Sequence, residues 1–242
     1  VLRHLGIDDM DEFLGIALGD LNNVDLSKFN HTKDFVAEKE VMSVRKQVGF
    51  VNMMEDVLKE LGSKIEPFTP KVLPAILYCL VLAARQLQKV MDVMVDEQPA
   101  VSNTSMLRVI RQTGFKCLDM MFTNDTQLDW SPFIPLILEE LIGPRIDKLP
   151  VETGQGVSVV LQLLSTWSSS ARTILRLGKD EMFLPKVVEC LAPQNSKDEV
   201  KLFALGIIKN VVVLARGSTT EPESLTTMVR STLLDKNMDT FL

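Results

Sequence analysis

Apolar residues recur at steps of three and four along most of this chain, which is the spacing of one face of an α-helix. No stretch alternates apolar and polar residues in the way that predicts a half-buried strand. Leu, Val, Ile and Met supply most of the apolar content, and Tyr78 is the sole tyrosine. The pattern therefore predicts an all-α fold.

The two clearest apolar stripes predict two long consecutive helices. The first is expected over about Glu38–Leu61, with Gly62 as its left-handed C-terminal residue. Its stripe comprises Val41, Val44, Val48, Val51, Met54, Leu58 and Leu61. The second is expected to start after Pro67 and Pro70, because proline is tolerated in the first turn of a helix. It is expected to end before Pro99. Its stripe comprises Leu73, Leu77, Leu80, Ala84, Leu87, Met91 and Met94.

The second of these helices contains the longest apolar run, Val72–Ala84. This run includes Pro74, is bounded by Lys71 and Arg85, and is shorter than the roughly 20 residues needed to cross a bilayer. We interpret it as a buried helix. Arg85 lies off the stripe, so Arg85→Ala is expected to change stability by about 0.5 kcal/mol or less.

Shorter patterns predict further helices on both sides of this pair. A short helix over Asp9–Leu21, capped by Asp8 or Asp9, comes first, and a polar loop over Asn22–Asp34 follows it. After the pair, one helix is expected from a cap at Asn103 or Thr104 to Met121, and another from Pro132 to a stop at Gly143-Pro144. Further helices are expected over Gln155–Trp167, Ala171–Leu177, Met182–Leu191 and Pro222–Leu234. One more is expected to start at a capping box formed by Ser196 and Glu199.

Three of the expected helices start with a shared pattern of Phe, any residue, Pro, any residue and two aliphatic residues. These starts are Phe68–Leu73, Phe133–Leu138 and Phe183–Val188, and they lie 65 and 50 residues apart. A HEAT-type helical pair has a period of about 40 to 47 residues, which insertions lengthen. The repeat predicts an α-solenoid of antiparallel, HEAT/armadillo-like helix pairs, continuous over residues 40–242 and entered by the short helix and loop of residues 1–39. A compact helical bundle is the alternative.

Composition narrows the class of protein. The 242 residues include 26 basic and 32 acidic side chains, giving a net charge of -6 that argues against non-specific nucleic-acid binding along the whole chain. Cys79, Cys117 and Cys190 lie far apart in apolar helices and are expected to be reduced and buried. The chain starts without Met and without a signal sequence, so we interpret it as part of a longer protein.

The sequence lacks the common motifs of catalytic, metal-binding and nucleotide-binding sites. It contains no GxxxxGK[S/T], GxGxxG, HExxH, CxxC or GxSxG pattern, so we predict no catalytic residue, no cofactor and no metal site. Trp130 and Trp167 are expected to pack between helices, because a base-stacking platform needs several aromatics beside basic residues. The acidic pairs expected to be helix caps and solvated faces are Asp8-Asp9, Asp11-Glu12 and Glu139-Glu140.

Two polar features leave alternatives open. Arg108, Arg111 and Lys116 lie on or near one side of the third long helix, and they could contact RNA phosphate or an acidic partner. An ordinary solvated face is the simpler interpretation. Ser168-Ser169-Ser170 could be phosphorylated, and a polar turn between two helices is the simpler interpretation there.

Two stretches of packing residues resemble a known family. They consist of Arg45–Leu58 running into Leu61–Ser63 and Pro67-Phe68, and of Asp129–Pro135 with Glu140–Ile146. Over roughly Val41–Pro150 the chain resembles the down-regulated-in-metastasis family, the very large HEAT-repeat scaffold proteins of the small-subunit processome. The segment after Trp167 resembles only a generic helical repeat.

The resemblance implies an internal piece of a much longer, nucleolar protein. Members of the family belong to the particle that contains a small nucleolar RNA and processes the precursor of 18S ribosomal RNA. They are extended scaffolds without known catalytic residues, so the resemblance transfers none to this chain. It implies partners among the proteins of a large ribonucleoprotein assembly. A local contact to pre-rRNA or small nucleolar RNA is left open. The resemblance implies no membrane partner and no small-molecule substrate.

We therefore predict a non-enzymatic scaffold of small-ribosomal-subunit biogenesis, located in the nucleus and nucleolus. Another HEAT/armadillo-type adaptor, such as a nuclear transport receptor or a kinase-complex scaffold, is the first alternative. An all-helical enzyme is the second, and it would need convergent polar groups in a pocket.

Overall fold

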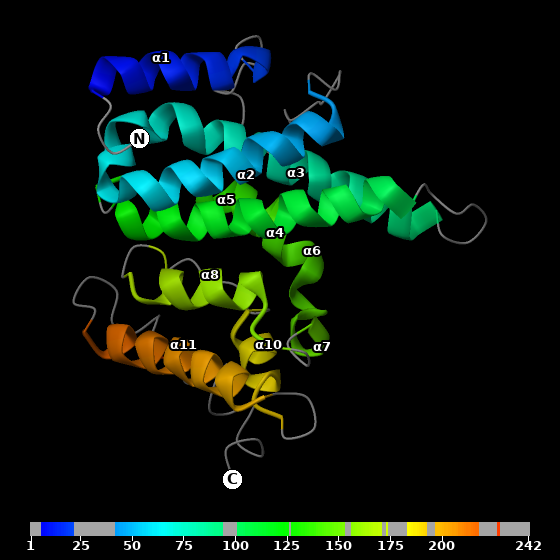
Figure 1. Cartoon of the computed structure of the whole chain (residues 1–242). Coiled ribbons are helices and arrows are strands. Elements are labelled where there is room, and N and C mark those ends of the chain that lie inside the picture. The colour runs from blue at the N-terminus through cyan, green and yellow to red at the C-terminus, as the bar shows by residue number, and fades with distance from the viewer. Residues whose placement is uncertain are drawn as a thin grey trace. The chain divides into compact units, whose positions relative to one another are not determined.

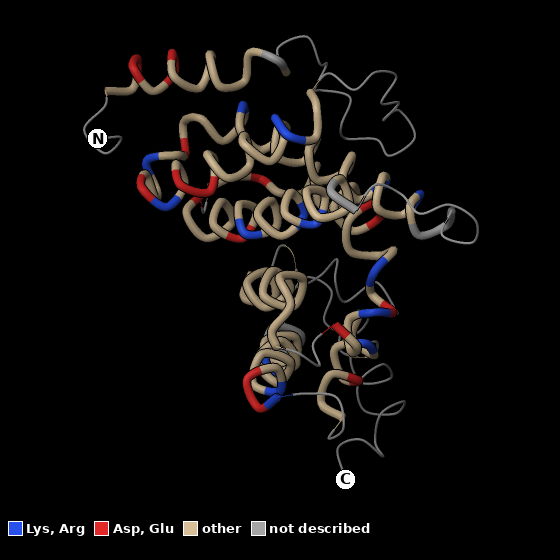
Figure 2. Tube along the Cα trace, turned by 45° about the vertical axis from the view of Figure 1, so that its right-hand side comes forward, with Lys and Arg blue, Asp and Glu red and all other residues tan. Residues whose placement is uncertain are grey.

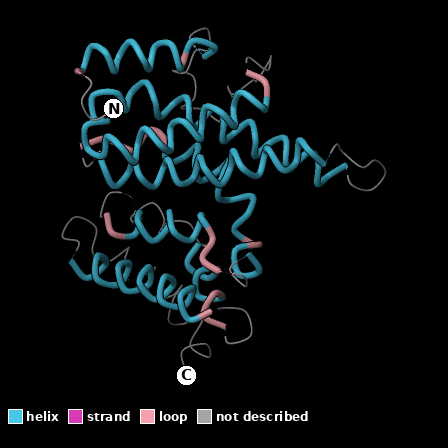
Figure 3. Tube along the Cα trace, viewed as in Figure 1, coloured by secondary structure: helices cyan, strands magenta, loops and turns pink. Residues whose placement is uncertain are grey.

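The computed structural model describes residues 6–21, 42–93, 101–125, 127–152, 156–170, 173, 183–192, 197–217 and 227. Within these residues all regular structure is helical and no strand occurs, which confirms the predicted all-α fold (Figures 1 and 3). The backbone divides into two compact units, Val1–Leu141 and Ile142–Leu242. The continuous solenoid over residues 40–242 stays a prediction.

The first unit is built around three long helices. They are preceded by a short helix and joined in part by a 3-10 segment, and the elements are α1 (Ile7–Ala17), η2 (Gly19–Leu21), α2 (Val44–Leu61), η4 (Gly62–Phe68), α3 (Thr69–Val93) and α4 (Val101–Asn124). Helix α3 runs antiparallel to both α2 and α4 (Figure 1). Helix α4 packs against both α2 and α3, so it is central to this unit.

Local chemistry explains both ends of α2. The Ser43 hydroxyl accepts a hydrogen bond from the N–H of Lys46 at 3.4 Å, which satisfies one of the free donors of the first turn. At the other end Gly62 has φ +54°, and its N–H donates to the carbonyl of Leu58. The predicted role of Gly62 is confirmed, whereas the predicted start near Glu38 lies outside the described residues.

The buried face of α2 overlaps the predicted stripe without matching it. The stripe residues that are buried are Val51, Met54, Leu58 and Leu61, while Val44 and Val48 are half-buried. Gln47, Phe50 and Val57 are buried as well, which widens the face beyond the aliphatic stripe. The burial of Gln47 is compensated in part, because its side-chain N–H donates to the carbonyl of Met42 at 2.8 Å, while its Oε1 has no hydrogen-bond partner among the described residues.

Helix α3 is buried on all sides in its first half. Every residue from Val72 to Ala83 is buried, which confirms the interpretation of this run as a core helix. An 18-residue window within Val44–Val90 is apolar enough, by length and composition alone, to cross a membrane, with a mean hydropathy of 1.6. Because 78% of that window is buried inside the structure, its apolar character is explained by packing.

Helices α3 and α4 approach each other closely at Gly114. A Cβ atom built there would lie 2.6 Å from Cδ2 and 2.7 Å from Cγ of Leu80, which is closer than real side-chain atoms pack. Leu80 is itself fully buried, so it has little room to move away. The glycine is therefore required by packing between the helices rather than by the backbone conformation.

Two predicted helix starts need correction. Helix α1 starts at Ile7 rather than Asp9, because Asp9 caps from inside the helix: its carboxylate accepts the N–H of Gly6 at 3.2 Å. Helix α4 starts at Val101, before the caps expected at Asn103 or Thr104, since both residues are accommodated within the helix.

The predicted stop at Gly143-Pro144 is also wrong. The α-helix α5 (Ile134–Leu136) leads into a π-helical segment, η5 (Ile137–Ile142), and α6 (Gly143–Ile146) follows without a break. Pro144 lies at the start of α6, directly after the π-helical segment, so the Gly-Pro pair is accommodated at the junction of the two helical segments and does not end the helix.

The second unit holds shorter helices. After α6 these are α7 (Leu149–Glu152), α8 (Val159–Ser168), α10 (Phe183–Glu189) and α11 (Asp198–Gly217). Helix α11 packs against α8 and α10, and α10 also contacts α7. Ser158 caps α8, since its hydroxyl accepts the N–H of Leu161 at 3.2 Å. The helices expected over Gln155–Trp167 and Met182–Leu191 are confirmed with shorter bounds.

Some predicted features lie largely outside the described residues. They are the loop over Asn22–Asp34, the helix over Ala171–Leu177, the cap at Ser196 and the helix over Pro222–Leu234. The shared helix start can be checked in all three places, because Pro70, Pro135 and Pro185 lie in the first turns of α3, α5 and α10. The starts are confirmed, and the stacking of helix pairs that they suggest stays a prediction.

Candidate interaction surfaces

The structure separates the three basic residues expected on one side of α4. Lys116 forms an ion pair of 3.6 Å with Glu55 of α2, and Glu55 also pairs with Lys59 at 2.8 Å. The hydrogen bond from Lys59, helped by the charge of Lys116 and opposed by partial burial, lowers the pKa of Glu55. Lys116 therefore belongs to a surface ion-pair cluster with α2.

Arg108 and Arg111 lie one helical turn apart on α4, and neither pairs with Glu55. Arg108 is exposed and Arg111 is half-buried. Among the described residues, neither guanidinium forms an ion pair or a hydrogen bond with another side chain. Burial lowers the pKa of Arg111, and the positive charge of Arg108 lowers it further, with no carboxylate acting in the opposite direction. In the described part of the chain, these two guanidinium groups therefore lie outside the ion-pair clusters.

Acidic residues are the only charged residues on α1, as Figure 2 shows. Asp8, Asp9, Asp11 and Glu12 are exposed, and Asp9 acts as a cap. Asp11 forms an ion pair with Lys71, which ties α1 to α3. Helix caps and solvated positions are what the sequence predicted for these pairs.

Glu140 departs from the predicted solvated face. Arg85 donates to it twice, from Nε to Oε2 at 2.9 Å and from Nη2 to Oε1 at 2.6 Å. The Arg85 side chain is 31% exposed and that of Glu140 is 18% exposed, so the pair is partly removed from water. Arg85 lies off the apolar stripe, but it is engaged with Glu140, because residues that follow α4 in the chain pack beside this end of α3. The small effect expected from the sequence for Arg85→Ala is therefore replaced by a larger one.

Truncating Arg85 is expected to destabilise the first unit measurably. Arg85→Ala should lower the free energy of unfolding by about 1 to 3 kcal/mol, because Glu140 would keep a half-buried carboxylate without its bidentate partner. Urea unfolding followed by circular dichroism measures this. Lys89→Ala is the control, since Lys89 is exposed on the same helix, and it should change stability by about 0.5 kcal/mol or less. Equal effects of the two substitutions would contradict the role of the ion pair.

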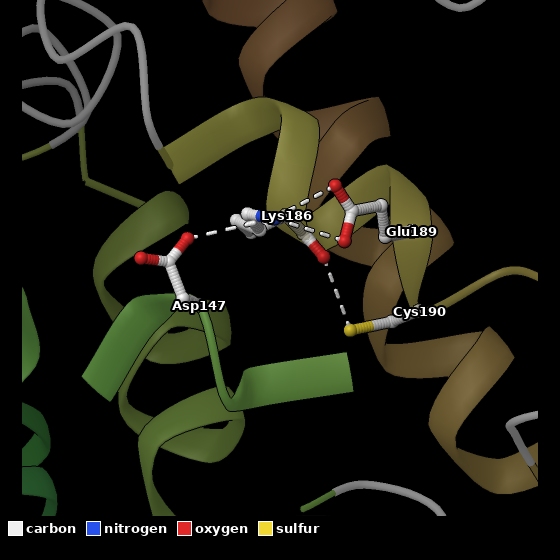
Figure 4. Close-up of polar contacts among 4 residues, drawn as sticks. All are labelled: Asp147, Lys186, Glu189 and Cys190. Carbon is white, nitrogen blue, oxygen red and sulfur yellow. Dashed lines mark hydrogen bonds and ion pairs between the residues drawn. The ribbon is translucent and has the colours of Figure 1, made fainter. Parts of the chain in front are cut away.

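The second unit contains its own polar cluster, drawn in Figure 4. Lys186 donates to both carboxylate oxygens of Glu189, at 2.9 and 3.1 Å, and pairs with Asp147 at 3.5 Å. The hydrogen bond to Glu189 raises the pKa of Lys186, and Asp147 adds to the effect. The Cys190 thiol donates to the carbonyl of Lys186 at 3.3 Å. These contacts tie α10 to the turn after α6.

A second ion pair, between Arg145 and Glu152, joins α6 to α7 in the same unit. The lysine and arginine in these clusters are thus each matched by a carboxylate. These ion pairs link short helices, and each contributes roughly 0 to 1 kcal/mol because the groups are partly exposed to solvent. Among the described residues, no group of three or more His, Cys, Asp or Glu is placed to hold a metal ion.

The three cysteines are free and buried, as predicted. Burial raises the pKa of the Cys79 thiol to about 12. Burial also raises the pKa of the Cys117 thiol to about 12, and the carboxylate of Glu55 adds to this effect. Both thiols therefore behave as small core side chains rather than as nucleophiles.

Native labelling of Cys79 and Cys117 is expected to be very slow. With a pKa of about 12, only about one thiol in ten thousand is ionised at pH 8, and the thiolate is the reactive form. Iodoacetamide treatment followed by mass spectrometry, with and without urea, tests this. Labelling should be complete in urea and negligible in the folded chain. Rapid native labelling of either residue would contradict its burial.

The serine triplet forms a turn at the end of α8. Ser168 is buried, and its hydroxyl donates to the carbonyl of Ser165 at 2.7 Å and accepts from the Asn210 side chain at 3.0 Å. Phosphorylation of Ser168 would break the link from α8 to α11. The neighbouring Ser169 is exposed and donates to the carbonyl of Thr166 at 2.6 Å. Ser168 is therefore a packing residue at the end of α8, and the polar turn between two helices stays a prediction.

The two tryptophans are packing residues, as predicted. Trp130 is buried and lies tilted against Phe122, with ring centroids 5.3 Å apart. Trp167 is fully buried in α8. Neither ring presents a face on which a base could stack.

Comparison with known proteins identifies the family. Residues 1–242, the whole chain, match the family model described as U3 small nucleolar RNA-associated protein 20, N-terminal. The chain belongs to this family. Membership in the U3 small nucleolar RNA-associated protein 20 family confirms the resemblance found in the sequence. Most of the residues that carry the resemblance lie in the first unit, and Ile142–Ile146 lie in the second.

Two curated members of this family are similar to parts of the chain. The U3 small nucleolar RNA-associated protein 20 of Schizosaccharomyces pombe is 26% identical over 170 residues, which cover 69% of this chain and 6% of the relative. The protein of the same name from Saccharomyces cerevisiae is 27% identical over 160 residues, covering 65% of this chain and 6% of the relative. The chain thus corresponds to a small share of each relative's length.

Proposed function

We propose that this chain is a non-enzymatic helical scaffold segment that acts in small-ribosomal-subunit biogenesis. It works within the small-subunit processome, in the nucleolus, and supports processing of the 18S rRNA precursor. The observation that carries the proposal is the match of all 242 residues to the U3 small nucleolar RNA-associated protein 20 family. The curated relatives carry the same name, which describes association with a small nucleolar RNA.

The arrangement of charged groups supports a scaffold rather than a catalyst. In the described residues, the half-buried carboxylate of Glu140 is held by Arg85, and Lys186 is held by two carboxylates. Catalysis needs titratable groups that converge on a shared space and remain free to exchange protons. Groups committed to ion pairs between helices instead hold a surface in place for partner proteins.

Affinity purification of the tagged chain from nucleolar extract tests this function. We expect enrichment of U3 small nucleolar RNA, 18S precursor RNA and small-subunit assembly proteins over a tagged helical-repeat control. Leu80→Asp, which introduces a charge into the core, is the matched variant and should lose the enrichment because the surface depends on folding. Recovery of transport cargo or of a kinase complex, without pre-rRNA, would instead support the adaptor alternatives.

Treatment of the purified complex with ribonuclease adds a second readout. A scaffold that contacts proteins directly keeps its protein partners after the RNA is removed. Loss of all partners would show that the chain is held in the particle only through RNA, which contradicts a protein scaffold.

A further inference from the structure

One run of α4 differs in charge from the rest of this acidic chain. Residues 98–118 contain Arg108, Arg111 and Lys116 and no Asp or Glu, although the whole chain carries 32 acidic and 26 basic side chains. Lys116 is already paired with Glu55. The positive charge that remains on this run therefore belongs to Arg108 and Arg111.

The placement of these two arginines is unfavourable within the chain itself. Residues three apart on a helix are neighbours on its surface, so the two guanidinium groups repel each other. Arg111 is half-buried, and the part of the chain that the structure describes gives it no carboxylate. A partly desolvated charge without a counter-charge is costly, and an anionic partner would remove that cost.

The neighbouring side chains indicate which anion fits. Ser105 and Gln112 lie three and four residues from Arg108, so they share its side of α4, and both are at least partly exposed. Hydroxyl and amide groups beside arginine are the usual contacts to phosphate oxygens and to the 2′-hydroxyl of RNA. No exposed aromatic side chain lies on the described part of this run, so base stacking is not part of the arrangement.

We propose that Arg108 and Arg111, flanked by Ser105 and Gln112, form a contact for the phosphate backbone of RNA. The proposal rests on the proposed function, which places the chain in a ribonucleoprotein particle. The planar guanidinium can donate two hydrogen bonds to one phosphate, and two of them one turn apart can hold a short stretch of backbone. The contact is local and does not depend on base sequence. It does not require the RNA to approach the acidic remainder of the chain.

RNA binding by the 242-residue chain tests this site. The probe is a fluorescein-labelled single-stranded RNA of mixed sequence, titrated at several salt concentrations between about 50 and 200 mM. We expect the Arg108→Gln/Arg111→Gln variant to bind about tenfold more weakly, and the slope of log affinity against log salt to fall by about 0.7 for each phosphate that is no longer neutralised. Arg108→Lys/Arg111→Lys should keep most of the salt dependence and bind more weakly, because lysine lacks the bidentate geometry.

The matched control is Lys201→Gln/Lys209→Gln on α11, which removes the same two charges from the other unit and should leave affinity within about twofold. Circular dichroism of each variant confirms that it is folded. No RNA binding by the unaltered chain, or an equal effect in the control variant, would overturn the proposal. Binding of a polyglutamate peptide that depends on both arginines, without RNA binding, would assign the surface to an acidic protein instead. None of these results contradicts the proposed scaffold function, because affinity purification from nucleolar extract tests that function separately.

Discussion

Leu80→Ala is expected to lower the free energy of unfolding of the first unit by about 2 to 5 kcal/mol, the usual loss for a fully buried leucine. Leu80 lies where α3 meets α4, against Gly114, so the removed atoms leave a cavity that neither helix can close. Leu80→Asp should cost more, because an unpaired carboxylate would enter an apolar layer. Urea unfolding followed by circular dichroism gives both values, and a cost below about 0.5 kcal/mol would contradict the burial.

The pairing of Leu80 with Gly114 makes a sharper form of this experiment possible. Gly114→Ala alone should destabilise, at about 1 to 3 kcal/mol for overpacking, partly offset by the better helix propensity of alanine. In the Leu80→Ala background the added methyl group enters the vacated space. The double variant should therefore cost less than the sum of the two single costs, with a coupling of about 0.5 kcal/mol or more. Additive costs would mean that the two residues do not pack against each other.

Hydrogen exchange shows how far the damage spreads. We expect Leu80→Ala to reduce protection across α2, α3 and α4 and to leave the protection of α11 unchanged, because local packing units open separately. Uniform loss along the chain would favour one cooperative bundle. Lys89→Ala replaces Arg85→Ala as the neutral control, since Arg85 is engaged with Glu140.

Helix positions and their main buried residues could be predicted from the sequence because both depend on local spacing. Leu80 and the rest of Val72–Ala83 are buried as the apolar run predicts, and Gly62 ends α2 as its position predicts. The exact buried face could not be predicted in the same way. Gln47 is buried because its amide reaches the carbonyl of Met42, and such compensation is invisible in an apolar stripe.

Contacts between distant parts of the chain explain the errors about charged residues. Arg85 and Glu140 are 55 residues apart, and no spacing rule connects them. The sequence groups the three basic residues of α4 by their proximity along one helix, but Lys116 pairs with Glu55 of α2, whereas Arg108 and Arg111 do not. The sequence therefore indicates a basic surface on α4. Only the packing of α2 against α4 separates Lys116, which has an ion pair, from Arg108 and Arg111.

Trp167→Ala is expected to be the most damaging alanine substitution in the second unit. Trp167 is fully buried in α8, the helix that packs on α11, and its carbonyl accepts a hydrogen bond from the Thr173 hydroxyl. Removing an indole from such a position costs about 3 to 5 kcal/mol, because the cavity is too large for neighbouring side chains to fill. Circular dichroism should follow the unfolding, since the substitution removes a fluorophore.

Two comparisons test whether the stability loss expected for Trp167→Ala results from the lost packing of the indole ring. Trp167→Phe keeps a ring in the core and should recover a large part of the loss, whereas Leu202→Ala on α11 removes a side chain that is 70% exposed and should change stability by about 0.5 kcal/mol or less. Hydrogen exchange on Trp167→Ala should show lower protection in α11 while α2 and α3 keep theirs, the reverse of the Leu80 result. Loss of protection in α2 and α3 as well would mean that the two units unfold together as one cooperative unit.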